Sequence, residues 1–331
     1  MATLAANNLT LTDIAKEELP DGTIERDMVE LLAQDNEVLQ DMAWMEANGG
    51  TFHRSVQRVS IPEPTWRRFY EGVLPTKTES AQIDEPMGMM ENRSVLDKDL
   101  GDMSPNLAAV RMNEATGILE GFNQSFTSTL LTGASSTAPA KFNGILPRYA
   151  SLSGITAANI IDGGGTGSDN ASILLVNWGP RTVFGIYPRG SKAGMSREDL
   201  GVQQVLDSNS PGRRFSAYEE IFKWNCGLVV RDWRHIVRIA NIDKSNLVAQ
   251  SGAAAILELM AAAVDKIPSG NGGRPAFYMN RTLKTMLRIQ CMKQANVYLT
   301  VGGEEGRPKL SFDAIPIRKV DQMAADETRV T

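Results

Sequence analysis

The most regular pattern of apolar and polar positions lies between residues 103 and 131. Apolar side chains recur there at steps of three and four residues, which predicts one long helix with a single apolar face. The apolar positions are Leu107, Val110, Ala115, Ile118, Leu119, Phe122, Phe126 and Leu130. Ser104 followed by Pro105 is a typical helix start, and Gly133 is a candidate C-cap. The helix would be roughly 40 Å long, so we expect it to back a sheet or other elements.

Alternation of apolar and polar positions predicts strands in the second half of the chain. Residues 222–230 alternate over their whole length, as in a strand with one buried face. Two short apolar runs, at 173–176 and 183–186, are joined by the turn sequence NWGP. We expect residues 236–242 to pair with the strand at 222–230. Because strands and helices mix without a regular βαβ order, the predicted fold class is α+β.

The last quarter of the chain reads as strand, helix, strand, loop and strand. An Ala-rich helix is predicted before it, from Asn246 to Ile267. The helix within the last quarter spans residues 281–292, with Asn280 as its N-cap. A Gly-rich loop follows, and the closing strand contains Ile315, Pro316 and Ile317.

Residues 51–86 read as a long two-stranded excursion. A period-2 stretch ends at Pro62, and a second extended stretch is predicted to start at Trp66. Such a hairpin is marginally stable alone, so we expect it to lie on a neighbouring molecule. Its arginines and aromatics also suit single-stranded nucleic acid, but the acids Asp84 and Glu85 and the overall charge disfavour that interpretation.

Residues 1–50 carry weak helical periodicity, interrupted at Asp21 and Gly22. They are predicted to form an arm. The arm packs either on a neighbouring subunit or on its own domain, and the pattern does not choose between these alternatives.

Composition narrows the class of protein. The chain has 331 residues, 42% hydrophobic and 22% charged, which is typical of a globular protein. A net charge of -5 argues against a dedicated DNA-binding protein, although local basic patches stay open. Cys226 and Cys291 are expected to be reduced and buried. The sequence starts without a signal-peptide pattern and has no apolar run of membrane length, so we expect a soluble protein made in a cytoplasm, with no membrane partner.

Candidate catalytic chemistry is sparse. His53 and His235 are the two histidines, and a structural role is favoured for His235. The sequence contains no GxSxG, HExxH or EF-hand pattern. We therefore predict no catalytic residues and no cofactor.

Three other clusters are candidate ligand sites. The tip of a hairpin is favoured over a phosphate cradle for the glycines between 163 and 167, because the lysine of a P-loop is missing and aspartates flank them. The methionines at 87, 89 and 90 could bind a soft metal, but adaptable packing at the base of the hairpin is favoured. The aspartates at 97, 99 and 102 read as a solvated turn. No metal site is predicted.

The order of these elements resembles the major capsid protein of tailed bacteriophages, which has the HK97-like fold, and most of all its short-tailed phage versions. The motifs that carry the resemblance are FYMNRTLKTMLRIQ, VYLT and LSFDAIPIRKVDQM near the C-terminus, and KFNGI after the long helix. One position departs from the pattern. Ala314 stands where many members have glycine before Ile-Pro.

The resemblance implies a layout of five parts. They are an N-terminal arm (1–50), an extended loop or E-loop (51–86), a peripheral region with a spine helix (87–150, helix 103–131), an axial region (151–308) and a return to the peripheral region (309–331).

The resemblance also implies a function. The expected protein is not an enzyme; it self-assembles through hexamers and pentamers into an icosahedral shell around packaged double-stranded DNA. Scaffolding protein, portal and a cementing or decoration protein are implied partners, with non-specific contact to the DNA. The expected location is the virion capsid, assembled in the cytoplasm of a bacterial host. Two alternatives stay open, an encapsulin-like compartment and a soluble enzyme.

Some members of the resembled family crosslink their shells through a Lys–Asn isopeptide bond promoted by a buried Glu. Lys77 is the one lysine of residues 51–86. A surface charge is the favoured role for it.

Overall fold

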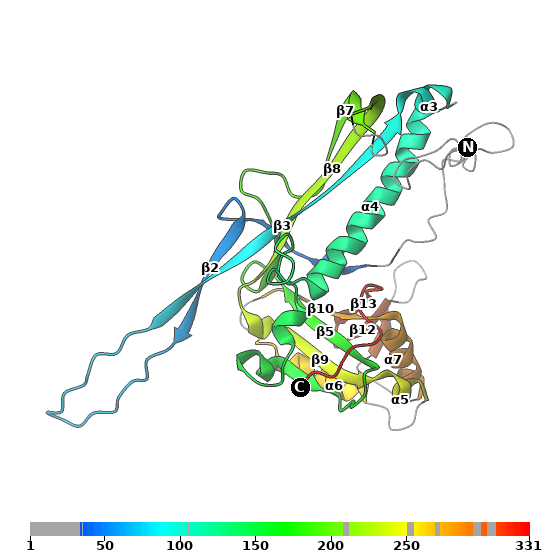
Figure 1. Ribbon diagram of the computed structural model, residues 1–331. Coiled ribbons are helices and arrows are strands. Elements are labelled where there is room, and N and C mark those ends of the chain that lie inside the picture. The colour runs from blue at the N-terminus through cyan, green and yellow to red at the C-terminus, as the bar shows by residue number, and fades with distance from the viewer. Residues whose placement is uncertain are drawn as a thin grey trace. The chain divides into compact units, whose positions relative to one another are not determined.

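The computed structural model describes residues 34, 36–104, 106–207, 212–249, 255–268, 272–293, 299–302 and 309–331 (Figure 1). The chain divides into two units. Unit 1 consists of Met1–Gln34, Met89–Phe126 and Gly194–Asn225, and unit 2 of Asp35–Gly88, Thr127–Ala193 and Cys226–Thr331. Most of the predicted arm, residues 1–33 and 35, lies outside the described residues.

A mixed sheet forms the centre of unit 2, and β5 (Asn170–Trp178) is its most buried strand, with every residue shielded from solvent. It pairs antiparallel with β9 on one side and with β10 on the other. The sheet continues from β10 through β13 and β12 to β11, while β9 also pairs with β4. The bounds of these strands are β4 Ile160–Asp162, β9 Ile236–Asp243, β10 Arg274–Met279, β11 Leu299–Gly302, β12 Lys309–Phe312 and β13 Ile315–Lys319.

The expected pairing of residues 236–242 with the strand at 222–230 is wrong. The strand at 222–230 belongs to β8 (Arg214–Val230), which pairs in unit 2 with β6 (Val183–Tyr187). Between β8 and β9 the chain forms a 3-10 turn, η3 (Trp233–His235), rather than a hairpin turn. Backbone amides of Arg231 and Asp232 donate to the carbonyl of Thr182, so the chain leaves the edge of β6 and enters beside β5.

The chain just before the extended loop folds onto its own sheet. α2 (Val38–Asp41) buries Val38, and β1 (Trp44–Glu46) pairs parallel with β6. The Arg318 guanidinium on β13 holds the Asp41 carboxylate at 2.9 and 2.8 Å. The last residues of the predicted arm therefore pack on their own chain. This is the second of the two alternatives that the sequence left open.

Helices cover the central sheet and close its core. α6 (Ile256–Lys266) and α7 (Arg281–Lys293) pack with α5 (Lys244–Ala249) against buried side chains of β5, β9 and β10. The prediction that Asn280 caps its helix is confirmed, since its Oδ1 accepts from the Leu283 amide at 2.8 Å. The predicted helix 246–267 corresponds to α5 and α6, with 250–254 outside the described residues. None of the described helices is long and apolar enough to span a membrane.

The long helix starts later than the apolar pattern indicated. α4 runs from Leu107 to Thr132, and the residues before it form a separate short helix, α3 (Lys98–Met103). Ser104 ends α3, and Asn106 is the residue that caps α4, since its Oδ1 accepts from the Ala109 amide at 3.2 Å. The expected N-cap at Ser104 is therefore wrong.

Close backbone packing at the end of α4 explains the KFNGI segment. The Gly133 amide donates to the Thr129 carbonyl at 2.8 Å, and the Gly144 amide donates to the Gly133 carbonyl at 2.8 Å. A Cβ on Gly133 would lie 2.5 Å from the carbonyl oxygens of Thr129 and Phe142, and one on Gly144 would lie 2.7 Å from that of Thr129. Both positions therefore exclude a side chain, because the segment turns back against the helix end.

Unit 1 is built from α3, the first part of α4, and all or part of three long strands, β3 (Glu79–Asp97), β7 (Ser196–Leu206) and β8. β7 pairs antiparallel with the first part of β8, and the last part of β3 also lies in this unit. A small apolar cluster joins Leu96, Ala109 and Val110. Phe126 and Trp224 stack with ring centroids 4.6 Å apart. The buried carboxylate of Glu220 pairs with two guanidiniums, from Arg111 and Arg197.

The turn between β12 and β13 holds two residues in the left-handed region. Phe312 and Ile315 pair directly, which leaves a two-residue loop, with φ of 49° at Asp313 and 61° at Ala314. Two positive φ values are the signature of a type I′ hairpin turn, whose second position favours glycine. Ala314, the position that departs from the family pattern, is therefore conformationally unfavourable.

We expect Ala314→Gly to raise the free energy of unfolding of the unassembled subunit by up to ~1 kcal/mol, because glycine adopts positive φ without a Cβ clash. Denaturant titration measures the change. Ala262→Gly, on an exposed helical position of α6, is the control and should lower the free energy of unfolding by ~1 kcal/mol. A loss of stability in both variants would contradict the assignment of the turn.

Candidate interaction surface

The extended loop is a hairpin with an open end. β2 (Phe52–Ser60) pairs antiparallel with the first part of β3, from Phe52 opposite Pro86 to Ser60 opposite Glu79. The second extended stretch, predicted to start at Trp66, is not a strand, because pairing resumes only at Glu79. Pro62, Pro64 and Pro75 lack the amide that a ladder needs, so residues 61–78 form the open loop in Figure 1.

Large apolar side chains of this open loop face solvent. Trp66 is 98% exposed and Phe69 is 95% exposed, and Tyr70 is fully exposed. Ile61 and Leu74 are also largely exposed. Buried aromatic side chains contribute 150–250 Å² of contact area each, and here none of the described residues covers that area. The loop end therefore resembles one side of a protein–protein interface.

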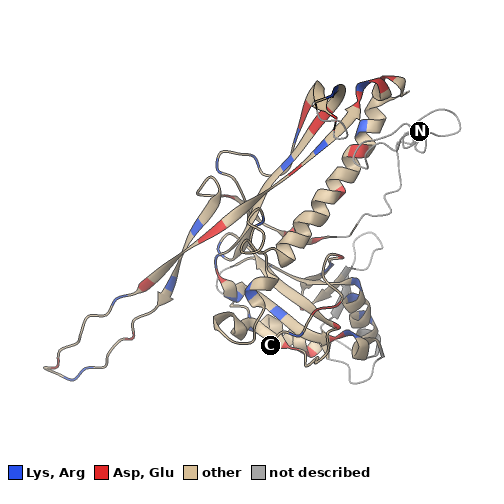
Figure 2. Cartoon of the chain, viewed as in Figure 1, with Lys and Arg blue, Asp and Glu red and all other residues tan. Residues whose placement is uncertain are grey.

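Charge accompanies the aromatic residues at the loop end. Arg67 and Arg68 lie between Trp66 and Phe69 in the sequence and are exposed, and Figure 2 shows Lys and Arg interspersed with Asp and Glu along the open loop. The Arg68 amide donates to the Glu71 carboxylate at 3.0 Å, which closes a short turn. The end of the loop thus combines apolar area with positive charge.

A buried ion pair holds the base of the hairpin. The Arg148 guanidinium binds the Glu85 carboxylate in a bidentate manner, at 2.5 and 2.7 Å. The Glu85 side chain is 3% exposed and that of Arg148 is 22% exposed. Arg148 also donates to the carbonyls of Gly144 and Asn143, at 2.9 and 3.2 Å. The pair therefore joins β3 to the segment that follows α4.

A second pair next to it lies in solvent. The Arg54 guanidinium binds the Asp84 carboxylate at 2.7 and 2.8 Å across the two strands. Their side chains are 49% and 47% exposed. The Asn48 side chain also accepts from the Arg54 amide and donates to its carbonyl, which fixes the start of β2.

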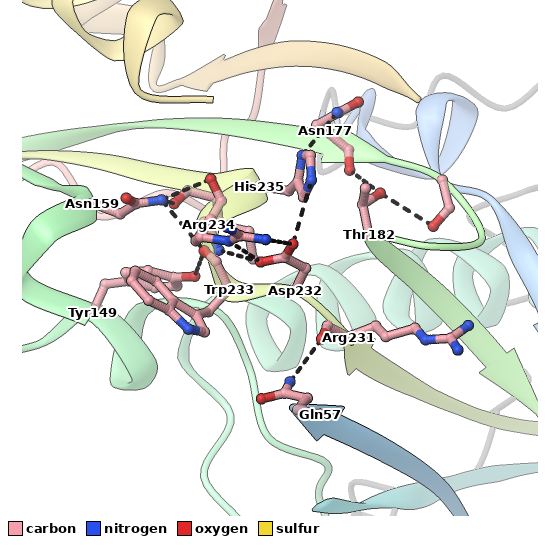
Figure 3. A network of polar contacts seen from close by, with 12 residues as sticks. Gln57, Tyr149, Asn159, Asn177, Thr182, Arg231, Asp232, Trp233, Arg234 and His235 are labelled. Carbon is pink, nitrogen blue, oxygen red and sulfur yellow. Dashed lines mark hydrogen bonds and ion pairs between the residues drawn. The ribbon is translucent and has the colours of Figure 1, made fainter. Parts of the chain in front are cut away.

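The hairpin also rests on a polar corner of unit 2, shown in Figure 3. The Gln57 side-chain amide donates to the Arg231 carbonyl at 2.7 Å. The Asp232 carboxylate then caps η3 by accepting from the Arg234 amide. The Tyr149 hydroxyl donates to the Trp233 carbonyl at 2.6 Å. Side chains thus bind the backbone groups of this corner, two of them from distant parts of the chain.

His235 belongs to this corner and is fully buried. Its Nδ1 lies 3.1 Å from the side-chain nitrogen of Asn177. Burial lowers its pKa, against a smaller opposing effect of the Asp232 carboxylate, so the ring is neutral at pH 7. Asn159 donates to the carbonyls of Arg234 and Ile236 beside it. The ring sits among structural hydrogen bonds, away from solvent.

The other candidate ligand residues are placed only partly as predicted: Met89 is 78% exposed rather than packed, and Asp99 and Asp102 lie in helix α3 rather than in a turn. Met87 packs against Phe184, Ile186 and Val229 near the base of the hairpin. The Asp97 side chain caps α3. In the described part of the chain, no three His, Cys, Asp or Glu side chains gather as a metal ion requires.

The amides of the glycine loop at 163–167 are directed into the protein. Gly163 donates to the Ala240 carbonyl at 2.8 Å, and Gly165 donates to the Asn241 carbonyl at 2.7 Å. Gly164 donates to the Asp162 carboxylate. The loop connects β4 to β5, which both pair with β9, so the description of it as a hairpin tip was wrong.

Cys226 is buried and free, as the sequence predicted. Burial raises the pKa of its thiol to about 12, so it stays protonated and unreactive at neutral pH. The side chain of Cys291 lies outside the described residues.

The chain is similar to known shell proteins. A family model described as "Major capsid protein GP7" matches residues 19–331. A structure of bacteriophage Epsilon15 matches with 34% sequence identity and a TM-score of 0.79, over 100% of this chain and 99% of that chain. No curated protein matches the sequence.

More distant structures also match. One is the encapsulin SrpI of Synechococcus elongatus, at 11% identity and TM-score 0.48, over 71% of this chain and 97% of that chain. Another is the capsid of bacteriophage JBD30, at 9% identity and TM-score 0.48, over 95% of this chain and 99% of that chain.

Loss of the buried ion pair and loss of the exposed ion pair should change the free energy of unfolding by different amounts. We expect Arg148→Met to lower the free energy of unfolding by about 3–5 kcal/mol, because it leaves the buried Glu85 charge without a partner. Arg54→Met is the matched control and should change it far less, since its pair is exposed to solvent. Denaturant titration of unassembled subunits measures both. Equal effects would show that burial of Glu85 is not what stabilises the base.

Proposed function

The chain belongs to the major capsid protein GP7 family, and from this premise we propose that its extended loop binds a neighbouring copy and so links subunits into the shell. A structural shell protein, the major capsid protein of a tailed phage, is the function that the family and the Epsilon15 match establish. The fold is the α+β, HK97-like capsid fold that the sequence predicted. The protein is located in the virion capsid, and the family is structural rather than enzymatic. The encapsulin alternative is not favoured, because the encapsulin match is distant.

One observation carries the proposed role of the loop. Trp66, Phe69 and Tyr70 face solvent almost completely, while the base of the same hairpin is fixed by a buried ion pair. A fixed base with an uncovered apolar end suits binding in trans, because the base limits the positions that the loop end can take before it docks. Many copies repeat each contact in a shell, so a modest contact suffices.

The finer assembly is also part of the proposal. Subunits group into hexamers and pentamers that close an icosahedral shell around double-stranded DNA, with non-specific contact to the DNA. Scaffolding protein, portal and a cementing or decoration protein act as partners, and assembly takes place in the cytoplasm of a bacterial host. In the five-part layout, residues 151–308 lie nearest the axes of these rings and residues 87–150 and 309–331 at their periphery.

Removing the apolar end of the loop tests its role. We expect the triple variant Trp66→Ser, Phe69→Ser, Tyr70→Ser to fold but to form few or no shells, because the docking area is lost. Size-exclusion chromatography with negative-stain microscopy measures shells, and circular dichroism checks the fold. The control Trp66→Phe, Tyr70→Phe keeps the apolar area and should assemble. Normal shells from the serine variant would refute the proposal.

Lys77 supports a second expectation. It is exposed in the open loop, and we propose that it forms no isopeptide crosslink. Boiled and reduced particles should then run as a single band near 36.1 kDa. A ladder of multiples that disappears in Lys77→Arg particles would show that the crosslink exists.

A further inference from the structure

α6 and α7 each turn an unpartnered face to solvent in unit 2. On α6, the exposed residues Glu258, Ala261, Ala262 and Asp265 follow the spacing i, i+3, i+4, i+7, so they form one stripe. The opposite side of the helix buries Ile256, Met260 and Ala263 in the core. The stripe thus has an acid at each end and two small residues between them.

α7 repeats the same spacing with the opposite charge. Its outer stripe consists of Arg281, Lys284, Thr285 and Arg288, whereas Leu283 and Leu287 are buried on the inner side. Figure 2 shows Lys and Arg bands on this helix. Arg318 and Lys319 of β13 lie close enough to Lys284 to act on it electrostatically. The stripe is therefore strongly cationic.

Four of these charges form no ion pair with another residue of the described ranges. Arg281 reaches Asp321 at 3.2 Å, but no ion pair joins Lys284, Arg288, Glu258 or Asp265 to another residue in the described ranges. Lys284 is half-buried, and burial is the largest cause that lowers its pKa, with Lys319, Arg318 and Arg288 adding to it against Glu37. A half-buried cation among cations is an unfavourable arrangement that an external anion relieves.

We infer that the acidic stripe of α6 in one copy docks on the basic stripe of α7 in the next copy. This inference rests on the proposed function, because it requires copies arranged in rings. The two stripes are different patches of one chain, so their contact is head-to-tail, and contacts of this type form a ring when the rotation between copies closes.

The spacing of the charges fits this contact. Glu258 and Asp265 are seven residues apart, or ~10.5 Å along the helix axis, and so are Arg281 and Arg288. Ala261 and Ala262 allow the helix axes to approach to about 8–10 Å. The phosphates of DNA would satisfy the α7 stripe alone, but they leave the matching acids of α6 unexplained. A second copy accounts for both stripes.

Disulfide trapping tests the contact directly. In a Cys291→Ser background, the double variant Ala262→Cys, Thr285→Cys should form a ladder of disulfide-linked oligomers on non-reducing gels of assembled particles. The single variants Ala262→Cys and Thr285→Cys are the matched controls and should stay monomeric, because a head-to-tail contact brings residue 262 to 285 and not to itself. Shells that form normally without a ladder in the double variant would overturn the inference and leave the proposed function intact.

Charge reversal gives an independent readout. We expect E258K/D265K and K284E/R288E each to reduce the yield of shells at least tenfold, and the fourfold swap to restore assembly because it recreates the complementarity. Circular dichroism of unassembled subunits shows whether each variant folds. Unchanged assembly in both double variants, or reduced DNA retention in K284E/R288E with normal shells, would overturn the inference. A wild-type protein that remained a monomer would instead refute the proposed function.

Discussion

A two-stranded hairpin has no second layer to cover it, and this constraint governs the extended loop. Two strands alone are marginal in water, so the hairpin must be supported at one end and covered at the other. The pairing of β3 with β8 supplies part of the support, and the buried pair between Glu85 and Arg148 and the hydrogen bond from Gln57 to the Arg231 carbonyl add to it. Trp66 and Phe69 at the other end are not covered by any part of the chain that the structure describes. The base of the hairpin is therefore held by its own chain, whereas the apolar loop end is left exposed.

Much of the fold was predictable because it depends on local patterns. The apolar steps of α4, the alternation in β8 and the cap at Asn280 are each set by residues close in the sequence. Two of the predictions that were wrong concern the partner of β9 and the start of α4. In the first a distant strand competed as partner, and in the second a neighbouring residue competed as helix cap. The partner of β9 is chosen by β5, which is about 65 residues away and needs a neighbour on each side because both of its faces are buried. The start of α4 shifted because Asn106 competes with Ser104 as a cap.

The sequence predicted where the candidate surface lies, but not which contacts hold the base of the hairpin. The proline and aromatic content of residues 51–86 indicated an unsupported excursion, and the structure places its aromatic residues in solvent. The pair of Glu85 with Arg148 was missed, since the two residues are 63 positions apart and each has the appearance of a surface charge in the sequence. The sequence signal that marked this region was KFNGI, whose Gly144 brings the chain back against α4 just before Arg148.

The two kinds of surface suit different tasks in an assembly. Apolar area, as on the loop end, is non-directional and supplies affinity. Opposite charges at fixed spacing, as on α6 and α7, contribute little energy per exposed pair but penalise wrong registers, because a shift brings like charges together. A shell of identical copies needs both properties, since affinity without register gives irregular aggregates. The overall charge of -5 adds a weak mutual repulsion that the local complementarity must overcome. Correct rings are thereby favoured over random association.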